Sequence, residues 1–411
     1  MNIRSVTCFV NFDADAAADT IQSAGQVARR MREALEANGF PVQTTRLATQ
    51  PLSSLPGDPM RMATELGEQC HTAGFEYLSL GPVVADTAEI PRSGAAGHGL
   101  ARLERIPDMI RSTENVFAGV LVTHQARQSR GIHLEAVRRT AHIIREIAHT
   151  TDLGFGNLRL AMLANVGPHA PFFPAAYHDG GPPAVAIATE SADLAVAAFS
   201  EAGSLDEVRA RLVAEVERAA AQIDDLVRPL ASACGCRFAG LDFSLAPFPE
   251  EDRSIGAAVE HLGVDRFGAP GTLFAASLLT GCLRQASYAR CGFNGLMLPM
   301  LEDATLASRG RERLFTVNDL LLYSSVCGTG LDTVPLPGDV SEEELAGILL
   351  DVAVLALQLD KPLTARLMPV PGARAGDLTE FDFPYFANSR VLDVKGYGSR
   401  GLFERGVWLA M

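Results

Sequence analysis

The stretch Tyr323-Ser-Ser-Val-Cys-Gly-Thr-Gly-Leu-Asp-Thr-Val-Pro-Leu-Pro-Gly-Asp339 joins a thiol, two carboxylates, glycines and prolines to apolar residues. The two glycines after the cysteine permit backbone conformations that other residues avoid. Residues 331–334 are predicted as a short strand, which the two prolines end because proline cannot donate to a ladder. Such a turn and strand present a reactive group, with Cys327 and Asp332 as candidates. The alternative is a tight turn around a buried structural cysteine.

Composition sets the class of protein. The 411 residues are enough for one large domain or two ordinary ones, and 47% of them are hydrophobic, as in globular proteins. A formal charge of -14 argues against nucleic acids and anionic membranes as partners, since both attract basic surfaces. The first residues are predicted as a strand and lack the apolar core of a signal peptide, so a cytoplasmic location is expected.

Several cofactor motifs are missing from the sequence. There is no G-x-G-x-x-G after a predicted strand, so neither a nucleotide nor a flavin is expected. The seven cysteines are scattered and odd in number, which argues against a disulfide framework. The pair Cys234 and Cys236 has one residue between the thiols, which is not the usual zinc spacing.

Predicted strands and helices alternate along the whole chain, so the fold is predicted to be α/β. Ser204 and Glu207 form a capping box for a long helix over 204–231. This helix is interpreted as a connection between a first half, about 1–200, and a second half, 236–411. Two similar halves suggest a single barrel domain over 1–411 that is closed or nearly closed. A long loop is predicted over 84–99.

Acidic residues follow the predicted strands of the second half. Asp242, Glu302, Asp303 and Asp332 would meet at one rim if those strands lie side by side. Carboxylates without histidine partners suit a hard cation, and the expected cofactor is therefore Mg²⁺ or Ca²⁺ bound by Asp242, Glu302 and Asp303. Solvated loops on an acidic protein are the alternative, except for Asp242, which interrupts an apolar strand and must be paired if buried.

Basic residues near the end of the chain are candidates for holding a charged substrate. Only Lys361 and Lys395 are lysines among the 35 basic residues. Lys361 precedes a predicted strand and is a candidate base or Schiff-base amine, the alternative being a charge at a helix C-terminus. Arg366 on that strand would bind a carboxylate or phosphate in a bidentate way.

A proline- and glycine-rich loop follows the predicted strand over 158–165. It contains His178, which is a candidate for proton transfer at an active-site rim. Asn165 at the start of this loop is a predicted substrate-binding residue. Ser244 shares a strand face with Asp242 and is another.

The chain resembles the family of domain-of-unknown-function 711, whose members are often labelled PFL-like. The resemblance runs the length of the chain and is most specific at five motifs. They are Gly240-Leu-Asp-Phe-Ser-Leu-Ala-Pro-Phe-Pro249, Leu298-Pro-Met-Leu-Glu-Asp303, Val326-Cys-Gly-Thr-Gly-Leu-Asp332, Pro337-Gly-Asp339 and Thr364-Ala-Arg-Leu-Met-Pro369.

This resemblance implies a ten-stranded α/β barrel of the pyruvate formate-lyase and ribonucleotide reductase type, built from two five-stranded halves. In those relatives a cysteine inside the barrel carries radical chemistry, and Cys327 is the nearest counterpart. Family members are often encoded beside small amino-acid-binding regulatory proteins, so such a protein is a candidate partner. A homo-oligomer is expected.

The function predicted from these features is an enzyme for a small metabolite that carries a carboxylate or phosphate. Acid/base chemistry of the lyase, cyclase or isomerase type is favoured, with metal assistance, because no activated hydroxyl nucleophile is visible. Cys327, His178, Lys361 and Asp332 are the predicted catalytic residues. The alternatives are a non-catalytic metabolite-binding regulator and a radical enzyme that uses Cys327.

Overall fold

A large mixed sheet forms the centre of the protein. The computed structural model describes residues 1–12, 17–85, 98–124, 130–201 and 203–411. Within them, nine strands form one sheet in the order β10-β11-β7-β4-β3-β2-β1-β8-β9. They are β1 (Asn2–Phe9), β2 (Val42–Ala48), β3 (Tyr77–Val84), β4 (Val116–Leu121), β7 (Leu160–Ala164), β8 (Ala184–Glu190), β9 (Arg237–Asp242), β10 (Gly330–Pro337) and β11 (Leu363–Val370). Most of the loop predicted over 84–99 lies outside the described residues.

The strands run in two groups of opposite direction. β1, β2, β3, β4 and β7 are parallel to their neighbours, and so are the pairs β8–β9 and β10–β11. The groups meet at two antiparallel pairs, β1 with β8 and β11 with β7. The predicted α/β class is confirmed, with a sheet that is mostly parallel.

A segment without regular strand structure lies between the two ends of the sheet. Single parallel bridges join Leu245 of the chain after β9 to Leu296, and Pro299 to Asp332 of β10. Residues 295–300 make these bridges but form no continuous ladder. The closed ten-stranded barrel therefore stays a prediction, although these bridges bring both ends of the sheet to one segment.

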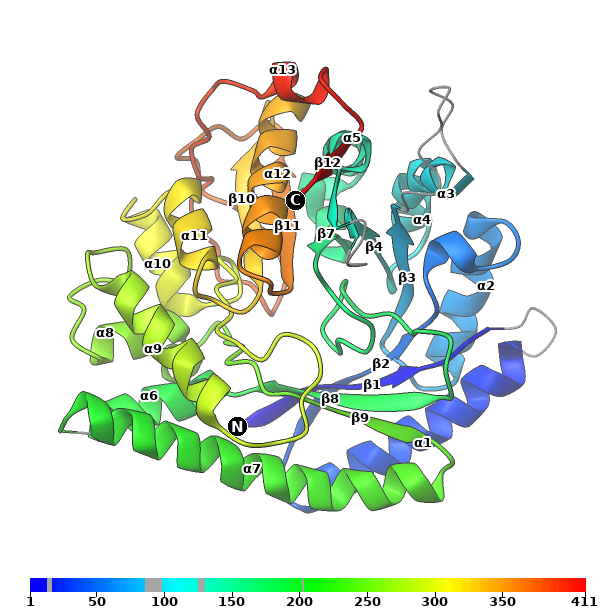
Figure 1. The fold of residues 1–411 in the computed structure, drawn as a ribbon, viewed down its shortest axis with the longest axis vertical. Helices are drawn as coiled ribbons and strands as arrows, with labels where there is room; N and C mark the ends of the chain where they lie inside the picture. The colour runs from blue at the N-terminus through cyan, green and yellow to red at the C-terminus, as the bar shows by residue number, and fades with distance from the viewer. Residues whose placement is uncertain (13–16, 86–97, 125–129, 202) are drawn as a thin grey trace.

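Helices cover the outside of the sheet (Figure 1). The longer ones are α1 (Ala17–Ala37), α2 (Pro59–Thr72), α5 (Leu134–Thr150), α6 (Ala192–Glu201), α7 (Leu205–Ala233), α9 (Thr272–Gln285) and α12 (Glu342–Gln358). The shorter ones are α3 (His98–Ala101), α4 (Ile106–Ser112), α8 (Ile255–His261), α10 (Ala304–Arg311), α11 (Val317–Ser324) and α13 (Arg400–Phe403). α7 packs against α1 and β9, and α12 packs against β11 and α5.

The long helix α7 begins where the sequence predicts. The Ser204 hydroxyl accepts a hydrogen bond from the Glu207 N–H at 3.2 Å, as an N-cap does. The Glu207 carboxylate accepts from the Gly203 N–H at 2.9 Å, one residue before the expected partner. Its buried stripe, which includes Val208, Leu212 and Val216, packs toward the core.

β10 is longer than predicted. It extends to Pro337 and includes both prolines that were expected to end it. They are tolerated because β10 is the last strand of the sheet, where one side needs no ladder donors. A register shift between Leu331 and Val334, with Thr333 at a φ of 42°, also breaks the expected alternation of faces.

A small sheet holds the C-terminal part of the chain. β12 (Trp408–Ala410) pairs with β6 (Gly131–His133), which pairs with β5 (Thr123–His124). A Cβ at Gly131 would lie 2.3 Å from the Leu409 carbonyl oxygen and 2.5 Å from the Trp408 ring, so only glycine fits there. The last strand is thus docked closely against the body of the protein.

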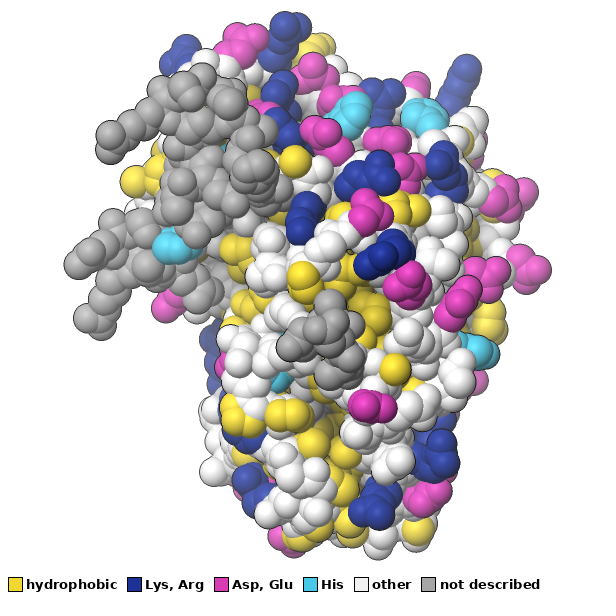
Figure 2. Space-filling view, turned by 90° about the vertical axis from the view of Figure 1, so that its right-hand side faces the viewer, with side chains coloured by type: hydrophobic (Ala, Val, Ile, Leu, Met, Phe, Trp, Pro, Cys, Tyr) yellow, Lys and Arg dark blue, Asp and Glu magenta, His cyan; other side chains and the backbone are white. Residues whose placement is uncertain are grey.

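The surface carries both signs of charge. On the face in Figure 2, basic and acidic side chains are interspersed, and hydrophobic side chains show between them. Among the described residues, none of the helices has the length and apolar character needed to cross a bilayer.

Candidate functional site

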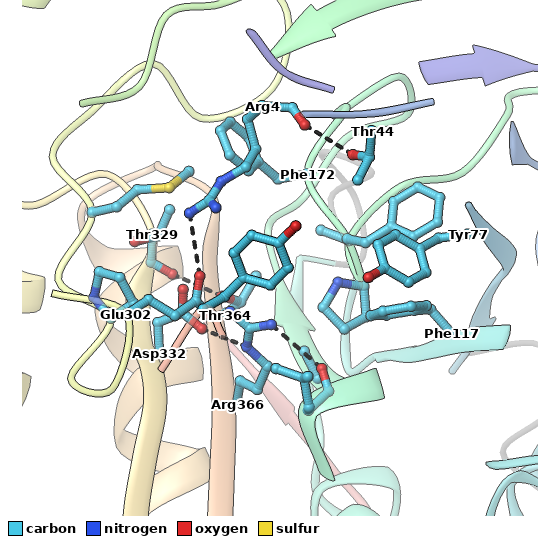
Figure 3. A pocket seen from close by; sticks show the side chains of 18 of the residues that line it. Arg4, Thr44, Tyr77, Phe117, Phe172, Glu302, Thr329, Asp332, Thr364 and Arg366 are labelled. Atoms are coloured by element: carbon cyan, nitrogen blue, oxygen red, sulfur yellow. Dashed lines mark hydrogen bonds and ion pairs between the residues drawn. The ribbon is translucent and has the colours of Figure 1, made fainter. Parts of the chain in front are cut away.

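A cavity of about 110 Å³ lies where the two groups of strands face each other. We call it the central cavity (Figure 3). β1, β2 and β3 contribute Arg4, Arg46 and Tyr77, and the other group contributes Asp332 and Arg366. Its apolar wall includes Leu158, Phe117, Phe172, Phe173, Phe293, Met297 and Phe383. The cavity therefore combines several charged groups with aromatic side chains.

Arg366 is fully engaged by two carboxylates. Its Nε donates to Asp332 Oδ1 at 2.6 Å and a terminal nitrogen donates to Glu302 Oε1 at 2.8 Å. Burial alone would lower the pKa of Arg366, but the two carboxylates outweigh it and the pKa is raised. Arg366 therefore holds both side chains in place.

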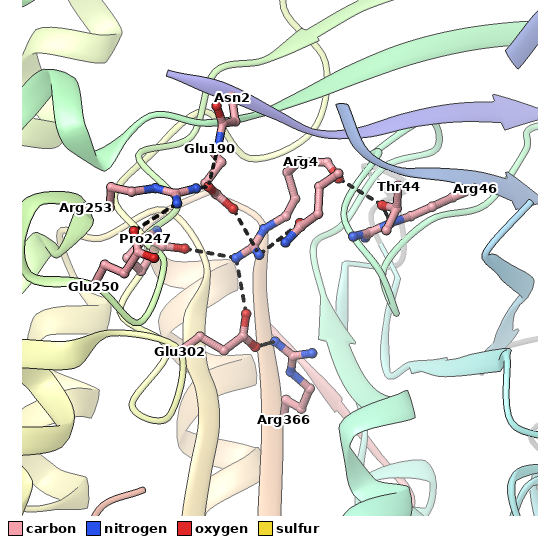
Figure 4. A network of polar contacts seen from close by, with 11 residues as sticks. Asn2, Arg4, Thr44, Arg46, Glu190, Pro247, Glu250, Arg253, Glu302 and Arg366 are labelled. Carbon is pink, nitrogen blue, oxygen red and sulfur yellow. Dashed lines mark hydrogen bonds and ion pairs between the residues drawn. The ribbon is translucent and has the colours of Figure 1, made fainter. Parts of the chain in front are cut away.

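Arg4 links this pair to a second acidic group (Figure 4). Its guanidinium lies 3.3 Å from Glu302 Oε2 and 3.2 Å from Glu190 Oε2. Arg253 contacts the other oxygen of Glu190. Burial lowers the pKa of Arg4 although Glu302 opposes the shift. The result is a chain of alternating charges along one side of the cavity.

Arg46 is the exception among these arginines. Only 8% of the residue is exposed, and its Nε donates to Thr44 Oγ1 at 2.9 Å. Within the part of the chain that the structure describes, its two terminal nitrogens have neither a carboxylate nor a hydrogen-bond partner. The guanidinium instead lies 5.3 Å from the Phe173 ring centroid and 5.7 Å from that of Tyr77. Burial and the nearby Arg4 charge lower the pKa of Arg46 to about 10, so it is still cationic at neutral pH.

Tyr77 places a phenol next to this cation. Its ring packs edge-on against Phe117 at 5.1 Å between centroids. Burial raises the pKa of Tyr77, and the Arg46 charge only partly offsets the shift. The phenol therefore keeps its proton at neutral pH and is available as a proton donor.

The charged side chains that line the central cavity do not balance. Three arginines, Arg4, Arg46 and Arg366, face two carboxylates, Glu302 and Asp332. Both carboxylates are already paired, so one positive charge is left and it lies at Arg46. A buried cation without a counter-charge is costly, which suits a site that takes an anion.

The structure gathers only part of the predicted acidic rim. Glu302 and Asp332 lie together in the central cavity, whereas Asp242 does not line it. Asp242 Oδ1 accepts from the Ser244 hydroxyl at 2.6 Å and the Asn294 N–H at 2.9 Å, and Oδ2 accepts from the Phe293 N–H at 2.7 Å. The Asp242 carboxylate and the Ser244 hydroxyl therefore hold the backbone of residues 293–295 in place. We therefore leave both residues out of the site.

Asp303 also has a structural set of contacts. Its carboxylate accepts hydrogen bonds from the Ser254 hydroxyl, the Ile255 N–H and the Leu306 N–H at 2.5, 2.6 and 2.9 Å. It thereby caps the N-termini of α8 and α10 together. These donors account for the burial of Asp303 without a metal ion. Next to Glu302, the guanidinium groups of Arg4 and Arg366 occupy the positions where a cation would bind.

Cys327 and Lys361 lie together but outside the central cavity. Cys327 is a free, buried thiol whose sulfur accepts from the Gly330 N–H at 3.3 Å. The Lys361 ammonium donates to the Cys327 carbonyl oxygen at 2.5 Å. Both residues line another cavity, and Lys361 is thus separated from Arg366 although only four residues lie between them.

His178 and Asn165 are held by backbone contacts. His178 Nδ1 accepts from the Gly180 N–H at 2.8 Å, and Nε2 lies 3.1 Å from the Pro182 carbonyl oxygen. The Asn165 N–H donates to Thr123 Oγ1 at 2.8 Å, at a φ of 58°. Neither residue lines the central cavity.

His178 also belongs to the one group of potential metal ligands found among the described residues. His169, His178 and Asp179 place ligand atoms within 4.8 Å of one another. The guanidinium of Arg237 lies 3.2 Å from His169 Nε2, and both nitrogens of His178 already have backbone partners. A cation would have to displace these contacts, so this group is not part of the candidate site.

The site residues predicted from the sequence do not include Arg4, Arg46 or Tyr77. Arg4 lies in the predicted first strand, and Arg46 follows the polar residues Gln43-Thr-Thr45 in β2; both strands are buried along most of their length. A charged residue inside such a strand needs a partner or a ligand. Tyr77 gives no comparable signal, because tyrosine is common in strands.

The sequence matches one family of known proteins. Residues 1–388 match the family model described as "Uncharacterised ACR (DUF711)". A UPF0210 protein of Pyrobaculum arsenaticum is 34% identical over 395 residues, which cover 92% of this chain and 85% of that protein. The UPF0210 protein of Methanopyrus kandleri is 30% identical over 92% of this chain and 85% of its own length. That of Pyrobaculum aerophilum is 31% identical over 99% of this chain and 93% of its own length. The chain therefore belongs to the DUF711 family.

Proposed function

We propose that this protein is an enzyme that binds a small carboxylate- or phosphate-bearing metabolite in the central cavity. The observation that supports this is Arg46, a buried cation that faces the cavity without a counter-charge. An anionic group of the substrate would accept hydrogen bonds from its terminal nitrogens. Such charge-assisted bonds are stronger than neutral ones, and more so away from water.

The proposed chemistry is acid/base catalysis of the lyase, cyclase or isomerase type. Tyr77 is the proposed proton donor, since it keeps its proton and lies beside the anion-binding group. Glu302 or Asp332, each hydrogen-bonded to Arg366, is the proposed proton acceptor. The cavity is small, so the substrate is of the size of a short organic acid and is surrounded by aromatic rings.

Two variants test this proposal, with one matched control. The protein would be titrated with a set of small carboxylates and phosphorylated acids by calorimetry, and conversion would be followed by NMR. Arg46→Met should weaken binding at least about tenfold, because a hydrogen bond to a charged group contributes about 1.5 to 3 kcal/mol. Tyr77→Phe should retain most binding and lose turnover.

Arg159→Met is the control. Arg159 is a partly buried arginine, but its guanidinium donates to the Thr113 and Ile110 carbonyl oxygens at 2.6 Å, away from the central cavity. This variant should bind the anion like the original protein. A folded Arg46→Met protein with unchanged affinity would exclude the site. If a compound binds in a way that depends on Arg46 but no compound is converted, the protein is a metabolite-binding regulator and not an enzyme.

A further inference from the structure

A second cavity, of about 530 Å³, lies beside Lys361. We call it the Lys361 cavity. It is formed by the C-terminal part of α9, the segment 290–294, the Cys327–Gly328 turn and the chain between α12 and β11. Its volume falls in the range of metabolite-binding pockets. The function proposed for the central cavity makes no use of this second cavity. The polar and charged residues that line it therefore point to a separate role.

Lys361 is an unusual residue in this protein. It is one of two lysines, and only 9% of it is exposed. Its ammonium donates to the Cys327 carbonyl oxygen, and in the described part of the chain it has no carboxylate within 4 Å. Burial lowers the pKa of Lys361, and the nearby Arg284 charge acts in the same direction. An ammonium has three donors, and one contact to a carbonyl leaves two of them for a ligand.

A second polar group points to the same conclusion. Thr280 on α9 lines the Lys361 cavity and is 4% exposed. Its hydroxyl oxygen is buried, and none of the residues that the structure describes makes a hydrogen bond to it. Buried hydroxyl groups are nearly always satisfied, so an orphaned one beside a cavity indicates that a ligand or water completes it.

The charges around the Lys361 cavity are mostly positive. Among the described residues that line it, Lys361, Arg284 and Arg290 face a single carboxylate, Asp360. Asp360 is exposed and is paired with Arg130 at 3.2 Å, so it does not neutralise the cavity. The three basic side chains therefore give the cavity a surplus of two to three positive charges, with Lys361 at its buried end and the two arginines toward solvent.

We propose that the Lys361 cavity is a binding site for the phosphate group of a phosphorylated metabolite. A phosphate ester carries about -1.5 to -2 charges at pH 7, which matches the surplus better than one carboxylate does. Its oxygens would accept hydrogen bonds from the Lys361 ammonium, the Thr280 hydroxyl and the Arg284 guanidinium, while Arg290, which already donates to carbonyl oxygens at the end of α9, adds its charge. Lysine is a common phosphate ligand, acting as a compact charge. The site is separate from Arg46 and does not depend on the function proposed for the central cavity.

The test is calorimetric titration with inorganic pyrophosphate in the absence of divalent cations. Lys361→Met should weaken binding at least about tenfold. Arg284→Met and Thr280→Val should weaken it by smaller factors. Lys395→Met changes the other lysine, which is exposed, and should leave the affinity unchanged. Arg46→Met should also leave it unchanged, which distinguishes the two cavities.

Thermal melting of each variant decides which of them can be compared. A folded Lys361→Met protein that binds pyrophosphate like the original protein would overturn the proposal. The absence of binding to the original protein at 10 mM pyrophosphate, roughly the weakest affinity of interest for a metabolite, would overturn it as well. If Lys361→Met does not fold, unchanged affinity in both Arg284→Met and Thr280→Val overturns it. Loss of binding in Arg46→Met alone would place the phosphate in the central cavity instead.

Discussion

Three arginines in one cavity differ in what surrounds their guanidinium groups. Arg366 is held by two carboxylates and Arg4 by Glu302 and Glu190, whereas Arg46 faces two aromatic rings. The first two arginines stabilise the carboxylates that they bind. The Arg46 guanidinium is not paired with a carboxylate of the described residues and can therefore bind an anionic ligand. Its surroundings, which differ from those of Arg4 and Arg366, make it the candidate anion-binding group.

Asp242 makes the stability of the protein depend on pH. Burial raises its pKa to about 6, above the ordinary 3.8, although the Ser244 hydroxyl and two backbone N–H groups oppose the shift. The folded state therefore holds a proton that the unfolded chain releases. The stabilisation is complete below pH 3.8 and is lost as the pH rises through 6, which corresponds to about 1 kcal/mol between pH 5 and pH 8.

Asp242→Asn should remove this component. Urea unfolding at pH 5 and pH 8 would give the free energy of unfolding of both proteins, and the quantity of interest is the difference between the two pH values. The original protein should lose about 1 kcal/mol more than the variant between pH 5 and pH 8. Asp339→Asn, which changes an exposed carboxylate, should behave like the original protein. An Asp242→Asn protein with the same pH difference would contradict the prediction.

At the scale of elements, helices followed from the sequence better than strands did. α7 was predicted within two residues of its ends, because apolar periodicity and the cap at Ser204 are local signals. β10 was predicted too short, because its prolines end a strand only if both sides need donors. That information lies in the neighbouring strands and not in the strand itself.

The turn before β10 depends on a close contact between two backbone segments. A Cβ at Gly328 would lie 2.5 Å from the Gly295 Cα, and a Cβ at Gly330 would lie 2.3 Å from the Thr364 carbonyl oxygen. Gly330 also has a φ of 95°, which disfavours side chains. Gly328 allows the segment around Gly295 to lie against this turn, and Gly330 allows the close approach of β11.

Gly328→Ala should therefore destabilise the protein by about 1 to 3 kcal/mol, the usual cost of overpacking a close contact. The matched control is Gly281→Ala in α9, where a Cβ meets nothing within 4 Å. That change should stabilise the protein by up to about 1 kcal/mol, since alanine favours helix. Chemical denaturation of both variants measures the two effects, and a Gly328→Ala protein as stable as the original would refute the contact.

At the scale of the whole molecule, the sheet brings together residues from the two ends of the chain. Arg4 contacts Glu302, and the segment near residue 296 bridges the chain after β9. The α/β class was predictable from alternation, but the pairing of β1 with β8 was not, because no local pattern records the order of strands. Lys361 and Arg366 were predicted to hold one substrate together, but they line different cavities. Their separation could not be predicted for the same reason, because it depends on how the strands are arranged.

The docking of the last strand gives this protein a built-in optical probe. Trp408 is its one tryptophan, and it lies in β12 against Gly131 and His133. Tryptophan fluorescence therefore reports the C-terminal strand alone, while far-ultraviolet circular dichroism reports the helices and the sheet. Since β12 is three residues long and half exposed, it should detach first. In a urea titration, the fluorescence change should precede the loss of helical signal; coincident curves would show that the C-terminal strand unfolds together with the core.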